Sequence, residues 1–232
     1  MKSSGLTKLG ERYGLGGGQL AQLSTILDAL KNDAYAPTTV IDTHEAVNVH
    51  LADSLAALEI VAVGEARRIA DIGSGAGFPG LALAVALPSA EVNLVESQRR
   101  KCEFLERVCL AAAVENARVV PARAEEWGDG SSHHDLVVAR ALAAQPVVLE
   151  YAAPLLKVGG ALVDWRGKRM PEEEDLADRA AEALGLRRTE VRRVVPFAGA
   201  RDHHLHVFVK VEETPARFPR RAGVARKRPL CC

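Results

Sequence analysis

The stretch Asp71-Ile72-Gly73-Ser74-Gly75-Ala76-Gly77-Phe78-Pro79-Gly80 decides the fold of this chain. Residues 68–72 are predicted to form a strand that runs into this stretch, and residues 79–87 a helix that follows it. The glycines allow a tight turn and a close approach of the backbone to a ligand, and Pro79 suits the first turn of a helix. The free amide groups at the start of that helix would face a nucleotide-like ligand.

Two cofactors compete for this turn. The pattern G-x-G-x-x-G of dinucleotide-binding proteins fits residues 75–80, and D-x-G-x-G-x-G, the first motif of methyltransferases that use S-adenosylmethionine, fits residues 71–77. A glycine-rich turn without a ligand is a third possibility. The next predicted strand, residues 91–95, leads to Glu96, about 20 residues beyond the glycines, where a carboxylate can accept hydrogen bonds from both hydroxyls of a ribose. Both cofactors contain adenosine, so Glu96 indicates a nucleoside without choosing between them.

Length and composition set the class of protein. A chain of 232 residues, 48% of them hydrophobic, can bury one sizeable core, and we expect one α/β domain with a short N-terminal extension. No apolar run approaches the length of a membrane span, and residues 1–4 are not followed by the core of a signal peptide. The four cysteines, at positions 102, 109, 231 and 232, form no C-x-x-C pair, so we expect reduced thiols, no metal site and a cytoplasmic location.

Positive charge is concentrated at the C-terminal end of the sequence. The chain has 30 basic and 30 acidic residues, but residues 217–232 contain six bases and no acid, so residues 1–216 have a net charge of −6. Interspersed prolines and a glycine predict an extended tail rather than a helix, a form suited to following a phosphate backbone. A solvated tail that only aids solubility is the alternative. The six bases are Arg217, Arg220, Arg221, Arg226, Lys227 and Arg228.

Apolar periodicity divides most of the chain into helices and strands. An amphipathic helix is predicted at residues 19–30 and a longer helical stretch at 43–63, on which His50 and Asp53 lie outside the apolar stripe. The later elements alternate, which predicts a parallel sheet with right-handed crossovers. They are strands 68–72, 91–95, 117–121, 135–139 and 160–165, and helices 79–87, 97–113, 145–156 and 171–184.

The end of the chain departs from this alternation. Strands are predicted at residues 188–195 and 204–211 with only a short loop between them, which indicates a closing antiparallel hairpin. Such a hairpin is typical of methyltransferase sheets, and plain dinucleotide-binding domains usually lack it. The predicted organisation is an N-terminal helical extension (1–64), a methyltransferase domain (65–212) and a basic C-terminal tail (213–232).

Five more motifs follow the glycine turn along the chain. They are ESQRRK at 96–101, RAEE at 123–126, VARA at 138–141, WRGK at 165–168 and FPRRAG at 218–223. In order and spacing, over roughly residues 40–230, the chain resembles the bacterial 16S ribosomal RNA guanine-N7 methyltransferases, also called glucose-inhibited division protein B. The resemblance implies the class I S-adenosylmethionine-dependent methyltransferase fold: α/β and Rossmann-like, with a mostly parallel seven-stranded sheet that ends in an antiparallel hairpin.

The resemblance also implies S-adenosylmethionine as cofactor, S-adenosylhomocysteine as product, no metal, and a set of site residues. Its cofactor contacts are Gly73, Gly75, Gly77, Phe78, Glu96, Ser97, Gln98, Ala124, Glu125 and Arg140. Arg123 and Arg140 would have positioning roles in catalysis. The RNA contacts would be Arg166, Lys168, Arg201, His203, Arg220, Arg221, Arg226, Lys227 and Arg228. Three of these residues have a structural alternative: Phe78 in the core, Glu125 as a solvated charge and Arg140 in an ion pair.

The chain departs from this family's pattern at two places. Residues 36–38 read Ala-Pro-Thr where relatives usually have Asn-Leu-Thr, which leaves a substrate contact from that asparagine in doubt. Relatives usually have Arg-His-Leu where this chain has His203-His204-Leu205, so either His203 or the nearby Arg201 replaces the arginine. A metal site of His203, His204 and His206 is the less favoured interpretation, because no cysteine lies nearby, and we expect satisfied surface histidines.

The implied reaction needs few side chains. N7 of neutral guanine has a free lone pair, so it can attack the sulfonium methyl group without first losing a proton, and no general base is required. Alignment of the reacting atoms should supply most of the rate. An arginine forked onto O6 and N7 would block the nucleophile, which leaves positioning roles for the arginines. The implied partner is 16S RNA or the small ribosomal subunit, bound by a monomer that needs no membrane.

Two other functions remain open. The second is an S-adenosylmethionine-dependent methyltransferase acting on a small molecule or a protein. It is less favoured than the RNA methyltransferase because such an enzyme has no need of a six-base tail. The third is a nicotinamide-dependent oxidoreductase. It is the least favoured, because the closing hairpin and the lack of a separate substrate domain argue against it.

Overall fold

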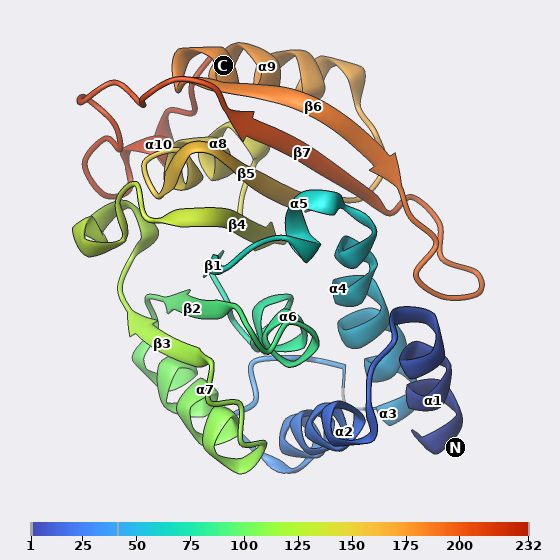
Figure 1. Cartoon of the computed structure of the whole chain (residues 1–232). Helices are drawn as coiled ribbons and strands as arrows, with labels where there is room; N and C mark the ends of the chain where they lie inside the picture. The colour runs from blue at the N-terminus through green and yellow to red at the C-terminus, as the bar shows by residue number, and fades with distance from the viewer. Residues whose placement is uncertain (1, 41, 232) are drawn as a thin grey trace.

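The computed structural model describes residues 2–40 and 42–231 and contains one seven-stranded sheet (Figure 1). The strands are β1 (Arg68–Ile72), β2 (Glu91–Glu96), β3 (Ala117–Pro121), β4 (His134–Arg140), β5 (Leu156–Arg166), β6 (Leu186–Arg193) and β7 (His204–Lys210). They lie in the order β3-β2-β1-β4-β5-β7-β6. Strands β1 to β5 are parallel, and β7 is antiparallel to both β5 and β6. The predicted parallel sheet and closing antiparallel pair are confirmed.

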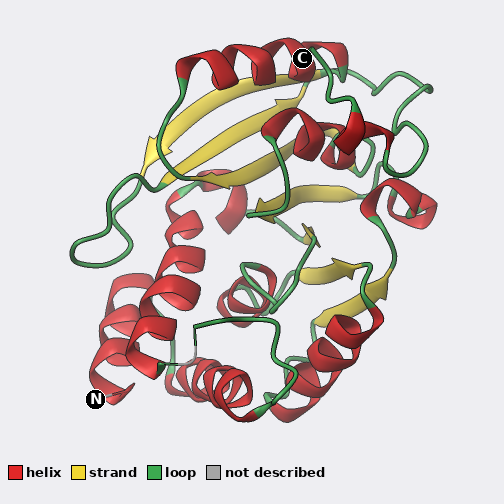
Figure 2. Cartoon of the chain, turned by 180° about the vertical axis from the view of Figure 1, so that it is seen from behind, coloured by secondary structure: helices red, strands yellow, loops and turns green. Residues whose placement is uncertain are grey.

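Helices cover both faces of the sheet (Figure 2). One layer holds α1 (Lys2–Tyr13), α2 (Gly17–Asn32), α6 (Gly80–Ala86) and α7 (Arg99–Ala111), and the other holds α8 (Gln145–Ala152) and α9 (Pro171–Ala183). Strand β4 serves both layers, because Leu136 and Val138 face the first core and Val137 and Ala139 the second. A strand buried on both faces must be apolar throughout, which is why residues 136–139 read Leu-Val-Val-Ala. None of the helices described is long and apolar enough to cross a membrane.

The N-terminal region differs from its prediction in two respects. Helix α1 is not predicted by periodicity, yet it packs against the core through its buried residues Leu6 and Leu9. The helical stretch predicted at 43–63 is present but is not one regular helix, because the chain there changes its hydrogen-bond pattern: the amide of Asp53 reaches back five residues to the carbonyl of Asn48. The segments are α3 (Thr43–Ala46), a π-helical segment η1 (Val47–Ala52), α4 (Asp53–Leu55), a 3-10 turn η2 (Ala56–Glu59) and α5 (Val61–Gly64). Short π-helical segments are frequent at functional sites.

Several later elements begin or end at residues other than those predicted. Helix α6 starts at Gly80 with Pro79 as its N-cap, and α8 ends at Ala152 because Pro154 has no N–H to continue the helical hydrogen bonds. Strand β5 begins at Leu156, four residues before its predicted start. The connection from β3 to β4 contains two 3-10 turns, η3 (Ala124–Glu126) and η4 (Gly128–Gly130).

The C-terminal tail is folded and packs on α8, so the prediction of an extended tail is wrong for residues 218–228. It includes the helical turn α10 (Val224–Lys227), which lies beside α8 (Figure 1). Phe218 and Ala225 are buried in the same core as α8 and α9. The division of the chain at residues 64 and 212 stays a prediction.

Candidate functional site

A cavity of about 410 Å³ lies beyond the carboxyl ends of four neighbouring strands. Its wall includes residues that directly follow these strands: Gly73 after β1, Ser97 after β2, Ala122 after β3 and Ala141 after β4. The strand order reverses between β1 and β4, and an open α/β sheet binds its ligand in the crevice at that reversal. The topology and the cavity therefore point to the same place.

The glycine turn after β1 is held by backbone hydrogen bonds, within the turn and to β2. The amide of Gly73 donates to the carbonyl of Val95 at 2.8 Å, and the amide of Gly77 to the carbonyl of Ser74 at 2.7 Å. Gly73, Gly75 and Gly77 have φ angles of +73°, +55° and +95°, a region that side chains disfavour. This is why the turn needs glycine at these three positions.

Asp71, at the end of β1, acts inside the fold. Its carboxylate is buried and accepts a hydrogen bond of 3.0 Å from the amide of Gly80, the first residue of α6. Burial raises the pKa of Asp71 to about 7, against the opposing effect of the hydrogen bonds from Gly80 and Ser74. A Cβ on Gly80 would lie 2.5 Å from the Asp71 carboxylate, so the contact requires glycine. Asp71 thus fixes the start of α6 beside the cavity.

Glu96 presents a buried carboxylate to the cavity. Glu96 is only 5% exposed. Oε1 accepts a hydrogen bond of 2.8 Å from the amide of Gln98 and a long one of 3.5 Å from the Ser97 hydroxyl, and Oε2 accepts one of 3.1 Å from the amide of Gly75. Each carboxylate oxygen has two acceptor sites, so Oε2 can accept one further donor directly, and Oε1 can accept one when the Ser97 hydroxyl rotates away. The geometry leaves Glu96 able to receive two hydroxyl groups.

The opposite wall of the cavity comes from the β3 side and from α8. Arg123, Ala124 and Glu125 line it, together with Tyr151 of α8. The pKa of Tyr151 is raised, first by burial and then by the Glu125 carboxylate. The Arg123 side chain is 57% exposed, and its nearest acidic partner, Glu126, is 3.8 Å away. Arg123 therefore keeps its hydrogen-bond donors free at the rim.

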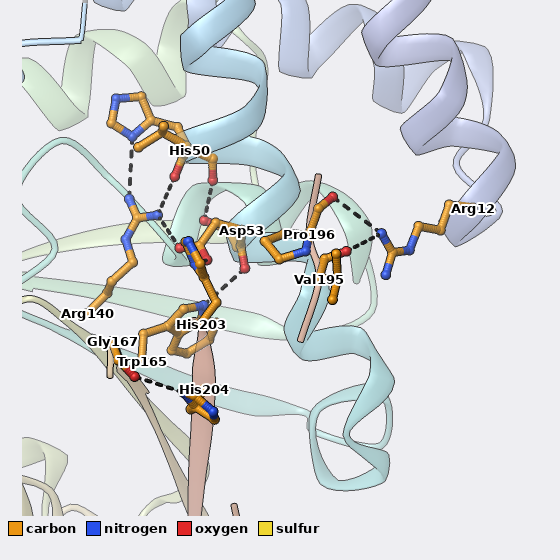
Figure 3. Close-up of polar contacts among 12 residues, drawn as sticks. Arg12, His50, Asp53, Arg140, Trp165, Gly167, Val195, Pro196, His203 and His204 are labelled. Carbon is orange, nitrogen blue, oxygen red and sulfur yellow. Dashed lines mark hydrogen bonds and ion pairs between the residues drawn. The ribbon is translucent and has the colours of Figure 1, made fainter. Parts of the chain in front are cut away.

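A second polar group, the Asp53 cluster, consists of His50, Asp53, Arg140 and His203 (Figure 3). Arg140 Nη1 donates to Asp53 Oδ2 at 3.0 Å and to the carbonyl of Val49 at 2.8 Å. The other carboxylate oxygen of Asp53 lies 2.9 Å from Nδ1 of His203. Asp53 thus joins α4, β4 and the segment before β7 at one point.

An aromatic stack borders this cluster. The rings of His50 and Phe78 are parallel, with an angle of 8° between them and 4.8 Å between their centroids. Burial, and then the charge of Arg140, lowers the pKa of His50 to about 4, so the ring is neutral near pH 7. Phe78 belongs to the glycine stretch, so it connects the cofactor turn to the Asp53 cluster.

Comparison with known proteins decides the family. The model of a protein family described as rRNA small subunit methyltransferase G (GidB) matches residues 19–205 of this chain. Over 220 residues the chain is 40% identical to a ribosomal RNA small subunit methyltransferase G of Rubrobacter xylanophilus, with 90% of this chain and 84% of that one covered. The chain belongs to the rRNA small subunit methyltransferase G family. A Desulfitobacterium hafniense protein of the same name is 36% identical over 221 residues, covering 93% of this chain and 91% of that one. The family predicted from the motifs is confirmed.

Solved structures give the fold of this family member. A structure described as a SAM dependent methyltransferase from Aquifex aeolicus matches with a TM-score of 0.56 at 18% identity, covering 70% of this chain and 91% of that one. At that identity the likeness concerns the fold alone. The predicted class I methyltransferase fold is confirmed.

The structure brings most of the predicted cofactor residues together at the cavity. Those that line it are Gly73, Glu96, Ser97, Gln98, Ala124 and Glu125, and the predicted positioning residue Arg123 lines it too. Gly75 supports Glu96 through its amide, and Gly77 packs against Leu81. Phe78 and Arg140 lie outside the lining, at the Asp53 cluster.

The nine predicted RNA contacts fall into two groups. Four of them have partners within the protein: Arg166 pairs with Asp164 at 2.6 Å, Arg220 with Glu150 at 2.5 Å, His203 with Asp53, and Arg226, which lines the cavity, donates to the carbonyl of Leu142 at 3.2 Å. The other five are exposed: Lys168, Arg201, Arg221, Lys227 and Arg228. The same basic segments therefore contain side chains that are bound within the protein and side chains that are exposed and available to RNA.

The expectation of surface histidines is wrong for His204 and His206. Both are buried, because β7 lies inside the sheet between β5 and β6 rather than at its edge. His204 Nδ1 lies 2.8 Å from the carbonyl of Gly167, and burial lowers the pKa of His206 to about 4. Within residues 2–40 and 42–231, no group of three or more His, Cys, Asp or Glu side chains is arranged to hold a metal ion.

Sequence reasoning missed three contributions to the site. His50 and Asp53 are visible as polar residues outside the apolar stripe of their segment, but nothing local links them to Arg140. Tyr151 lies in an apolar helix, where an aromatic residue is more often core. Arg226 is one of six similar bases, and its sequence context does not separate it from Lys227 beside it.

Proposed function

We propose that this protein transfers the methyl group of S-adenosylmethionine to N7 of a guanine in 16S ribosomal RNA. The observation that carries the proposal is the buried Glu96 carboxylate, which faces the cavity with one acceptor site free on Oε2 and with a rotatable hydroxyl, that of Ser97, as the second donor to Oε1. Family membership supports the class of reaction.

The cavity residues suit an adenosine-containing cofactor. Glu96 would accept hydrogen bonds from the two ribose hydroxyls, and Glu125, with Ala124, would contact the adenine ring. Gly73 leaves the backbone bare where the turn meets the loop after β4: a Cβ there would lie 2.5 Å from Leu142. S-adenosylmethionine, when bound, supplies an electrophilic methyl group on a positively charged sulfur. S-adenosylhomocysteine would leave by the same contacts.

The Asp53 cluster suits the positioning of the acceptor base. Arg140 is followed directly by Ala141, which lines the cavity, so the cluster adjoins the cofactor site. The arginine is already bound to Asp53 and to the Val49 carbonyl, which holds its guanidinium in place. N7 of guanine must stay free to attack, so Arg140 would orient the base or a phosphate rather than fork onto N7 and O6. His50 is neutral and is not needed as a base.

The exposed bases suit the RNA backbone. Lys168 follows β5, Arg201 lies two residues before His203 of the Asp53 cluster, and Arg221, Lys227 and Arg228 lie on the tail. Replacing the last three by glutamine should lower the salt slope of RNA binding by about 2, at roughly 0.7 per phosphate contact for single strands. A slope equal to that of the wild type would assign the tail charges to solubility. We further propose that the protein acts as a cytoplasmic monomer.

One assay tests the proposal. The protein is incubated with methyl-labelled S-adenosylmethionine and small ribosomal subunits, or free 16S RNA, from cells lacking this modification. The expected product is one N7-methylguanine, located by chemical cleavage at the modified base. Transfer to protein or to small molecules in an extract, with none to 16S RNA, would favour the second function instead. The Glu96→Ala variant is the control for a cofactor-dependent signal.

A further inference from the structure

Residues 218–228, which we call the C-terminal clasp, are tied to α8 and η3. The Glu150 carboxylate, 1% exposed, accepts a hydrogen bond from the Arg220 amide at 3.0 Å and from Arg220 Nη2 at 2.5 Å. The amide of Gly223 donates to Glu125 Oε1 at 3.4 Å. Phe218 is buried beside these contacts. The clasp therefore has a defined position against the cavity wall.

Arg226 places a guanidinium in that wall. It lines the cavity with Glu125, Leu142 and Tyr151, and its Nη2 donates to the carbonyl of Leu142 at 3.2 Å. Ala225, only 2% exposed, fixes the orientation of α10 against the core. Glu125 raises and Arg226 lowers the pKa of Tyr151, whose largest shift comes from burial. A positive and a negative group thus meet at one end of the cavity.

The charges of the proposed cofactor decide which part of it fits this end. Its methionine half carries a sulfonium and an ammonium group, which a guanidinium would repel. Its purine is uncharged, and an arginine plane can stack on such a ring while its free N–H groups donate to ring nitrogens. Glu125 can accept a hydrogen bond from the exocyclic amino group of the same ring. The Arg226 end of the cavity therefore suits the purine.

We propose that the C-terminal clasp is a part of the cofactor site and that Arg226 binds the purine of S-adenosylmethionine. This inference rests on the proposed function, and it adds to that function a residue predicted from the sequence to contact RNA. It follows that cofactor affinity depends on a segment about 150 residues beyond the glycine turn, even though that turn and Glu96 are complete without it.

Calorimetry with two ligands tests the role of Arg226. S-adenosylmethionine and adenosine are titrated into the wild type, Arg226→Ala, Arg226→Lys and Arg217→Ala. Arg217 is the matched control, because it is a base of the same tail that covers the Phe218 ring and lies outside the cavity. Arg226→Ala should weaken both ligands by roughly tenfold, with Arg226→Lys between it and the wild type. Arg217→Ala should bind as the wild type does.

The outcomes separate this inference from the proposed function. Wild-type protein that binds no S-adenosylmethionine overturns both. Wild-type binding with an unchanged Arg226→Ala variant overturns the inference alone. A loss for S-adenosylmethionine without a loss for adenosine overturns the assignment to the purine. Thermal unfolding of each variant verifies that it is folded, which the exposed position of Arg226 favours.

Discussion

The glycine turn and the C-terminal clasp both border the cofactor cavity, but the residues that hold them in place lie at different separations along the sequence. In the turn, Gly77 bonds to Ser74 and Gly80 to Asp71, contacts that span three and nine residues, and the longest, from Gly75 to Glu96 and from Gly73 to Val95, reach only the next strand, 21 and 22 residues on. In the clasp, Arg220 and Glu150 are 70 residues apart, and Gly223 and Glu125 are 98 apart. A local turn can be predicted from its own residues. A side chain held by a distant partner cannot, and its charge alone misleads.

The largest expected effect concerns the anchor of the clasp. Arg220→Ala would leave the Glu150 carboxylate buried without its ion pair and should lower the free energy of unfolding by about 3–5 kcal/mol. Chemical denaturation measures it. Arg221→Ala, exposed beside it, should stay within about 0.5 kcal/mol of the wild type. Equal stability of the two variants would mean that the tail is as loose as its composition suggests.

The next effect concerns the turn side of the cavity. Glu96→Ala removes charge-assisted hydrogen bonds worth about 1.5–3 kcal/mol, so the affinity for S-adenosylmethionine should fall roughly ten- to a hundredfold. Calorimetry gives the dissociation constants. Glu103→Ala is the control, since Glu103 pairs with Arg99 on the surface of α7. An unchanged affinity in Glu96→Ala would remove the ribose contact from the proposed function.

A smaller effect tests the packing of the turn itself. In Gly80→Ala the new Cβ would lie 2.4 Å from Leu94 and 2.5 Å from the Asp71 carboxylate, and such overpacking should cost about 1–3 kcal/mol of stability. Gly128→Ala is the matched control, because a Cβ there meets nothing within 4 Å. Melting temperatures compare the two. If both variants melt together, the local contacts of the turn are not what holds α6.

The smallest expected effect is a rate that does not respond to pH. His50 has a pKa of about 4, so it stays neutral between about pH 6 and pH 8, where we expect single-turnover methyl transfer to be flat. This pKa is below the ordinary 6.5, so the His50 contribution to stability is complete above pH 6.5 and is lost as the pH falls towards 4. His50→Gln should remove that part of the acid loss. Asp71, which holds the start of α6, has a pKa of about 7, so Asp71→Asn is the control. A rate that collapses through one ionisation near neutrality in this variant as well, with RNA binding intact, would contradict the base-free mechanism.

The two sides of the site were predictable to different extents. Gly73, Glu96 and Ser97 could be placed because each follows a strand directly, and the carboxyl ends of parallel strands meet at one edge. The Asp53 cluster could not be assembled in the same way. Asp53 and His203 are 150 residues apart, and their contact depends on how α4 and the segment before β7 pack together.

The sequence by itself determined the parallel sheet, its antiparallel closure, the cofactor turn and the family, because strand periodicity, glycine conformations and motif spacing are local properties. Only the tertiary structure decided which charges remain available. It paired Arg220 with Glu150, joined Arg140 to Asp53, buried His206 inside the sheet and turned Arg226 towards the cavity. The physical reason is that a charged side chain takes its role from the partner and the burial that it finds in space, and neither is recorded in the residues next to it.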